Sequence, residues 1–100
     1  MTSPIAYRRK RALIIGVNQY QRDSLQYCTD DAEGLSNTLR RIDFVISLGL
    51  NCDPRKFYEI IDQFTKTIQR DDLALFYFAG HGKQLGDENY LLSSDYDYSF

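Results

Sequence analysis

Three short apolar runs, separated by two segments with helical spacing, constrain the fold of this chain more than any other feature. The runs are residues 11–17, 44–48 and 73–79. A short continuous apolar run suits a strand that is buried on both faces of a sheet. Strands that alternate with helices form parallel sheets with right-handed crossovers. We therefore predict an α/β domain with a central, mainly parallel sheet.

The two segments between these runs carry helix signals. In the first, Thr29 or Asp30 can cap a helix whose apolar positions recur at helical spacing as far as Ile42. In the second, Asp53 precedes Pro54, which is an N-cap followed by proline at the first helical position. After the third run we expect a turn at 83–88 and a short fourth strand at 89–92, paired back as a hairpin.

Charge and cysteine content exclude several classes of function. The net charge of -2 gives no reason to expect a nucleic-acid partner. The basic cluster at 8–11 precedes an apolar run that is too short for a membrane span or a signal peptide. Cys28 and Cys52 lack metal-ligand spacing, and one histidine cannot complete a zinc site with them. We expect free thiols, a cytoplasmic or nuclear location, and no cofactor, metal or membrane partner.

The histidine of this chain is the strongest candidate for chemistry. His81 lies between Gly80 and Gly82, directly after the third apolar run. Parallel strands bring their carboxyl ends to one edge, where open α/β sheets place their sites. We therefore expect residues 18–33 to meet residues 79–83 at that edge. An imidazole there can act as a general base or acid near neutral pH, although a surface histidine in a flexible turn is the alternative.

Other residues at this edge have simpler explanations. Gly80, Gly82 and Gly86 miss the dinucleotide-binding spacing by one residue and lead to a hairpin rather than a helix. Asp30 and Asp31 need no function beyond their favourable place at a helix start. The tyrosines, Tyr20 among them, are most simply packing and surface residues.

We also consider each cysteine as a candidate nucleophile. Cys28 shares the edge of His81, but we place it before the helix start, where the helix dipole stabilises a thiolate little. A half-buried loop cysteine is the simpler interpretation. We place Cys52 at the opposite end of the sheet and assign it no catalytic role.

Four blocks of this sequence resemble the clan of caspases, metacaspases and paracaspases. The histidine motif, Leu-Phe-Tyr-Phe-Ala-Gly-His-Gly at 75–82, is the most specific of the four. The others are the opening strand Arg-Ala-Leu-Ile-Ile-Gly-Val-Asn-Gln-Tyr at 11–20, Asp-Asp-Ala-Glu-Gly-Leu at 30–35, and Asn-Tyr-Leu-Leu at 89–92 followed by Asp95. The resemblance covers nearly the whole chain and implies a three-layer caspase-like fold.

The resemblance also implies an activity, that of a cysteine endopeptidase. His81 would be the base that activates the thiol, and the Gly82 N–H would be one donor of the oxyanion hole. Asp31 matches an acidic position that lines the primary specificity pocket in metacaspase- and paracaspase-like members. Caspases proper place an arginine shortly before this point, where the chain has residues 23–27, with only Arg22 somewhat upstream. The resemblance thus implies cleavage after arginine or lysine.

The nucleophilic cysteine of this clan follows the histidine by roughly 50 residues, which places it beyond Phe100. We expect residues 11–100 to be the N-terminal portion of a p20-type catalytic domain, truncated, after a disordered basic segment at 1–10. Expected partners are a polypeptide substrate and the C-terminal remainder of the protease domain, with a homo-oligomer as an option. A catalytically inactive pseudo-caspase that binds partners is the alternative, and an unrelated flavodoxin-like binding domain is a third. Whether this chain is itself an enzyme stays open.

Overall fold

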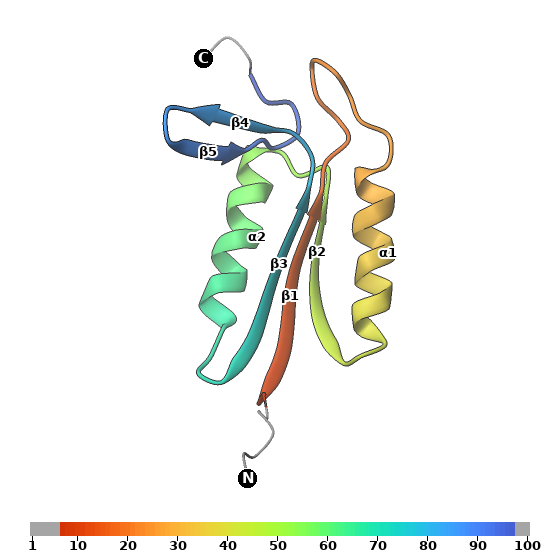
Figure 1. Cartoon of the computed structure of the whole chain (residues 1–100), viewed down its shortest axis with the longest axis vertical. Helices are drawn as coiled ribbons and strands as arrows, with labels where there is room; N and C mark the ends of the chain where they lie inside the picture. Colours follow the sequence, from red (N-terminus) through yellow and green to blue (C-terminus); the bar gives the residue numbers. More distant parts are fainter. Residues whose placement is uncertain (1–6, 98–100) are drawn as a thin grey trace.

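The computed structural model describes residues 7–97 as a parallel sheet, two helices and a hairpin (Figure 1). In chain order the elements are β1 (Arg9–Gly16), α1 (Cys28–Arg40), β2 (Phe44–Leu50), α2 (Pro54–Thr67), β3 (Asp72–Ala79), β4 (Gly82–Leu85) and β5 (Glu88–Leu91). The disordered segment predicted at the N-terminus falls largely on residues 1–6, which lie outside the described residues.

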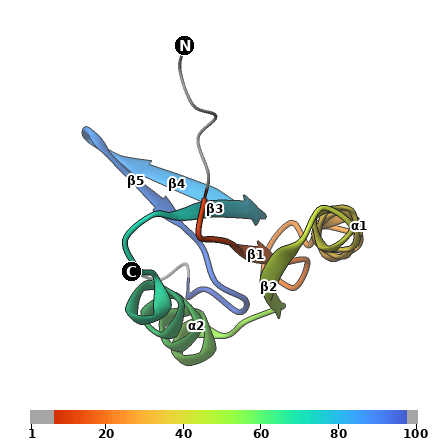
Figure 2. The same ribbon diagram turned by 90° about the horizontal axis from the view of Figure 1, so that it is seen from below.

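The sheet has the strand order β2-β1-β3, so the first strand of the chain lies in the middle. Both of its pairings are parallel, with Gly16 opposite Leu50 on one side and opposite Ala79 on the other. The carboxyl ends of the three strands therefore meet at one edge of the sheet. Helices α1 and α2 lie on opposite sides of the sheet (Figure 2). This arrangement confirms the predicted α/β fold with its central parallel sheet.

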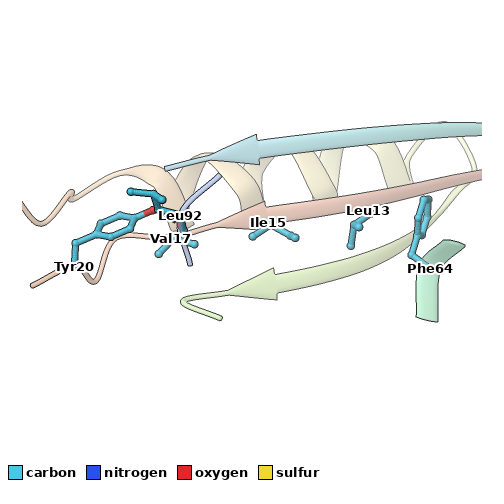
Figure 3. Close-up of a cluster of buried hydrophobic side chains, with 6 residues drawn as sticks. All are labelled: Leu13, Ile15, Val17, Tyr20, Phe64 and Leu92. Carbon is cyan, nitrogen blue, oxygen red and sulfur yellow. Dashed lines mark hydrogen bonds between the residues drawn. The ribbon is translucent and has the colours of Figure 1, made fainter. Parts of the chain in front are cut away.

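Side chains of β1 alternate between two hydrophobic cores, one on each face of the sheet. Leu13 and Ile15 pack with Phe64 of α2, while Ala12 and Ile14 belong to the core under α1. Figure 3 shows the first of these cores as a row that continues to the carboxyl end of the sheet. From Ala12 to Gly16 both faces of β1 are buried, which explains the continuous apolar run in the sequence.

The two helices begin in different ways. The Asp53 side chain accepts a hydrogen bond of 2.8 Å from the Lys56 N–H, which confirms the predicted N-cap of α2. Helix α1 begins at Cys28, earlier than predicted, and neither Thr29 nor Asp30 caps it. Its cap comes from the loop after β1, because Asn18 Oδ1 accepts from the Cys28 N–H at 2.8 Å and from the Thr29 N–H at 3.3 Å.

The predicted turn at 83–88 is too long. Strand β4 continues to Leu85 and pairs antiparallel with β5, which begins at Glu88. Gly86 has a φ of 60°, a value that glycine adopts without strain, so a tight turn joins the two strands.

At the end of the sheet where the strands begin, one ion pair joins the starts of β1 and β3. The Arg9 guanidinium donates to both carboxylate oxygens of Asp72, at 3.0 and 2.7 Å, and also to the Thr67 carbonyl at 2.8 Å. The Gln69 N–H donates to the same carboxylate at 2.7 Å. The Arg9 hydrogen bonds, and then the Gln69 N–H, lower the pKa of Asp72 to about 2. This pair extends β1 back to Arg9, two residues before the predicted start.

Replacing the Asp72 carboxylate should make the free energy of unfolding depend less on pH in the acidic range. The ordinary pKa of 3.8 falls to about 2 in the folded chain, so the unfolded chain binds this proton at higher pH. The stabilisation is complete above pH 3.8 and is lost as the pH falls through about 2. We expect Asp72→Asn to lower the urea midpoint at pH 7 and to differ less from wild type at pH 2.5. Asp62→Asn, which removes the exposed Lys66 pair, is the control. An equal deficit at both pH values would contradict the assignment.

Candidate active site at the carboxyl edge of the sheet

Loops from all three parallel strands join at the carboxyl edge. The Val17 N–H donates to the Ala79 carbonyl at 2.9 Å, and the Asn51 N–H donates to the Gly16 carbonyl at 2.8 Å. The Asn51 side-chain oxygen in turn accepts from the Asn18 N–H at 2.8 Å. The expected meeting of residues 18–33 with residues 79–83 is observed in the hydrogen bonds of His81 with Tyr20 and Asp23, and the loop after β2 joins them through Asn51.

His81 follows β3 and has one ring nitrogen bound to the loop after β1. Its Nε2 lies 2.6 Å from the carbonyl oxygen of Asp23. A carbonyl can only accept, so Nε2 carries the proton and Nδ1 is left as the basic nitrogen of the neutral ring. Asp23 has a φ of 53°, a left-handed conformation within a bend of the loop. The loop therefore selects the tautomer in which Nδ1 can accept a proton.

Tyr20 contacts the same histidine at its main chain and at its ring. Its hydroxyl accepts a 2.9 Å hydrogen bond from the His81 N–H, and its ring lies 4.5 Å from the imidazole, centroid to centroid. The hydroxyl also donates to the Leu92 carbonyl at 2.8 Å. Figure 3 shows the Tyr20 ring beside Leu92, beyond Val17 at the end of the buried row.

Glycine is required at position 80 because Tyr20 leaves no room there. A Cβ at Gly80 would lie 2.5 Å from the Tyr20 hydroxyl oxygen and 2.7 Å from the Phe78 ring. Real side chains do not tolerate such contacts. The Ala-Gly-His-Gly motif thus reflects, in part, the close packing of the Tyr20 hydroxyl against the main chain before His81.

The Gly82 N–H points away from the hairpin partner strand. Gly82 lies opposite Leu91, and the Leu92 N–H donates to the His81 carbonyl at 2.9 Å. In an antiparallel ladder, this bond flanks a non-hydrogen-bonded pair, so the Gly82 N–H is directed outward from β5. Gly82 is also exposed. Its N–H can therefore serve an acceptor outside the ladder, next to the histidine.

The structure corrects the positions predicted for both cysteines. Cys28 is the first residue of α1 rather than a residue before it, and Cys52 follows β2, so it lies at the same edge as His81. Even so, burial and then the Asp31 carboxylate raise the pKa of the Cys28 thiol. Burial and then Asp53 raise the pKa of Cys52. Both effects disfavour the thiolate, which is the nucleophilic form of cysteine.

Asp31 lies in the first turn of α1 with its side chain exposed. It does not contact the His81 ring, whose partners are Asp23 and Tyr20. Sequence reasoning also considered Asp30 as a cap, and it is exposed in the same turn without capping the helix. The two carboxylates form an acidic surface near the end of the loop from β1.

Cavities near this edge lie beside the histidine rather than over it. One of about 420 Å³ is lined by residues that follow β2 and begin α2, Cys52 among them. Another of about 370 Å³ lies against the hairpin and includes Lys83 and Leu92. Within residues 7–97, no three potential metal ligands gather into a cluster. Neither α1 nor α2, the helices of that part of the chain, has the length and apolar content needed to cross a membrane.

A parallel α/β sheet that presents a histidine with a free basic nitrogen beside an outward N–H defines a domain suited to acid–base chemistry at the sheet edge. A family model for the caspase domain matches residues 9–100. The chain therefore belongs to the caspase domain family, which confirms the predicted resemblance. That family is one of cysteine peptidases, so a peptidase-like function with protein substrates goes with membership. Among curated proteins, none matches this chain.

Sequence reasoning missed the residues that organise this edge. Asn18 and Tyr20 were not assigned a role in the site, and neither was Asn51. Their signal was position, because each is a polar or amphipathic residue just after a parallel strand. The contribution of the Asp23 carbonyl could not be found this way, since a main-chain atom has no residue type.

Both thiols should react slowly with alkylating reagents. The thiolate is the reactive species, and both pKa values are raised. We expect iodoacetamide at pH 8 to modify half-buried Cys28 before buried Cys52, and both more slowly than a cysteine peptide. Asp31→Asn should accelerate the reaction of Cys28, because it removes a neighbouring negative charge.

The urea-unfolded chain is the control, in which both cysteines should react alike, and tryptic mass spectrometry separates the two sites. Alkylation of folded Cys28 faster than that of the model peptide would show an activated thiolate and contradict this assignment.

Proposed function

We propose that this chain is part of a cysteine endopeptidase domain in which His81 is the catalytic base. The observation that carries the proposal is the hydrogen bond from Nε2 to the Asp23 carbonyl, which leaves Nδ1 basic. In the proposed reaction, Nδ1 takes the proton of a cysteine thiol as the sulfur attacks a peptide carbonyl. The outward Gly82 N–H then stabilises the negative charge that develops on the carbonyl oxygen. The protonated imidazole returns its proton to the leaving amine.

The nucleophile in this proposal is a cysteine outside the present sequence. Cys28 and Cys52 are poor candidates because both have raised thiol pKa values, and the ring contacts of His81 involve neither of them. Strand β3 is an outer strand of the three-stranded sheet, and β1 is its one partner within residues 7–97. A further parallel strand beside β3 would bring its own carboxyl end next to His81. That is where we place the nucleophile.

We further propose that the substrate carries arginine or lysine before the scissile bond, as in metacaspase- and paracaspase-like proteins. Asp31 is the residue at the matching pocket position, and it is exposed and able to receive a cationic side chain. The acidic surface that it forms with Asp30 would repel an aspartate side chain. Arg22, the nearest upstream cation, lies in the loop rather than in α1.

A pseudo-caspase that binds partners without catalysis is the second candidate. The raised pKa values of both thiols favour it for residues 7–97 taken alone. The two proposals differ in whether the complete protein cleaves peptides, so a peptidase assay of that protein separates them.

Removal of the imidazole should abolish turnover without unfolding the chain. His81 is half-buried and belongs to neither hydrophobic core, so the fold should tolerate alanine. We expect His81→Ala in the complete protein to reduce kcat by about 10²- to 10⁴-fold, as for loss of a general base. Gln84→Ala, at an exposed position of β4, should leave kcat unchanged. Fluorogenic peptides report the rate and circular dichroism the fold. Wild-type turnover in His81→Ala would end the proposal.

Neutralising Asp31 should weaken recognition of basic substrates. A charged hydrogen bond lost from a specificity pocket corresponds to about a 10- to 100-fold fall in kcat/KM. We expect this fall for Asp31→Asn on Arg and Lys peptides, in the complete protein. Glu33→Gln, an exposed acid on the same helix, is the matched control. A peptide library cleaved mainly after aspartate by the wild type would show that the pocket assignment is wrong.

A further inference from the structure

We propose that Tyr20 is a positioning residue for His81, with a hydroxyl that fixes where the imidazole presents its basic nitrogen. The inference rests on the proposed role of His81 as the catalytic base. Tyr20 touches neither the substrate nor the reacting sulfur in that proposal, and it acts only through the histidine.

The Tyr20 hydroxyl uses both of its hydrogen-bonding capacities on main-chain atoms of distant segments. It accepts from the His81 N–H at 2.9 Å and donates to the Leu92 carbonyl at 2.8 Å. The second bond links it to the end of the hairpin, and the Leu92 N–H in turn donates to the His81 carbonyl at 2.9 Å. One hydroxyl thus closes a ring of hydrogen bonds around the residue that carries the imidazole.

Tyr20 also contacts the imidazole and closes the loop that binds it. Its ring contacts the His81 ring in a tilted arrangement, with the centroids 4.5 Å apart, and its own carbonyl accepts a 2.9 Å hydrogen bond from the Ser24 hydroxyl. The bond from Ser24 closes the bend that contains Asp23, whose carbonyl binds Nε2 of His81. The main chain, the face and the Nε2 atom of His81 are therefore all held through one tyrosine.

Packing alone does not explain the tyrosine. The side chain is 6% exposed and belongs to the core of Leu13, Ile15 and Val17, where phenylalanine would fill the same space. A buried hydroxyl is retained at no cost only when its partners are present. The lack of a side chain at Gly80 also allows this oxygen to approach the main chain closely. The hydroxyl, rather than the ring, is therefore the specific feature of the site.

The test is Tyr20→Phe in the full chain, read out as the reactivity of His81 toward diethyl pyrocarbonate. His81 is the only histidine of the sequence, so the modified histidine is identified without ambiguity. Without the hydroxyl, the imidazole should leave the Asp23 carbonyl more often. The tautomer with its lone pair on Nε2 then also becomes available to the reagent, and modification should be roughly two- to tenfold faster, the effect of one lost hydrogen bond. Its reactivity-against-pH profile should also shift. Tyr58→Phe removes a hydroxyl from an exposed tyrosine and should change neither.

Reactivity in folded Tyr20→Phe that matches wild type at every pH would overturn the inference. If circular dichroism shows that the variant does not fold, amide exchange of the wild-type chain decides. Protection of the His81 N–H supports the bond to Tyr20, and exchange at the rate of an open loop overturns it. A wild-type turnover for His81→Ala in the complete protein would end the proposed function and leave these chemical readouts intact. The two failures are therefore distinguishable.

Discussion

The parallel pairing of β1 with both of its neighbours is the constraint on which the rest of this structure depends. Because β1 lies between β2 and β3, the three strands must end together, and the loops that follow them must share one small region. Main-chain bonds such as the one from Val17 to Ala79 continue the ladder into these loops. The position of His81 thus follows from strand order before any side chain at the edge is considered.

Side-chain amides and one phenol then convert this shared region into a defined geometry. Asn18 caps α1 while its own N–H is held by Asn51, so the loop after β1 is fixed to a helix and to the loop after β2. Tyr20 fixes the same loop to the histidine. The catalytic base in our proposal is therefore oriented by the Asp23 carbonyl and by the neutral Tyr20 phenol.

Sequence patterns were sufficient to predict the three parallel strands, their common direction and the place of the Gly-His-Gly segment directly after β3. Each of these depends on local patterning, such as the unbroken apolar run of β1 or Asp53 before Pro54, and patterning is visible in one dimension. The start of α1 and the place of Cys52 were missed for a common reason. Asn18 supplies its cap from ten positions upstream, and Cys52 reaches the edge only through the direction of β2. Contacts between residues that are far apart in the sequence produce no periodic pattern in it.

The histidine site is assembled from residues that lie far apart in the sequence. Tyr20 and Asp23 lie 61 and 58 positions from the residue that they hold. Contacts of such range require loop closure before they stabilise anything, so they form late in folding. The imidazole acquires its tautomer and orientation only once β3 has docked beside β1. A separation of β3 from β1 would therefore release the histidine from Tyr20 and Asp23 while β1 and β2 remained paired.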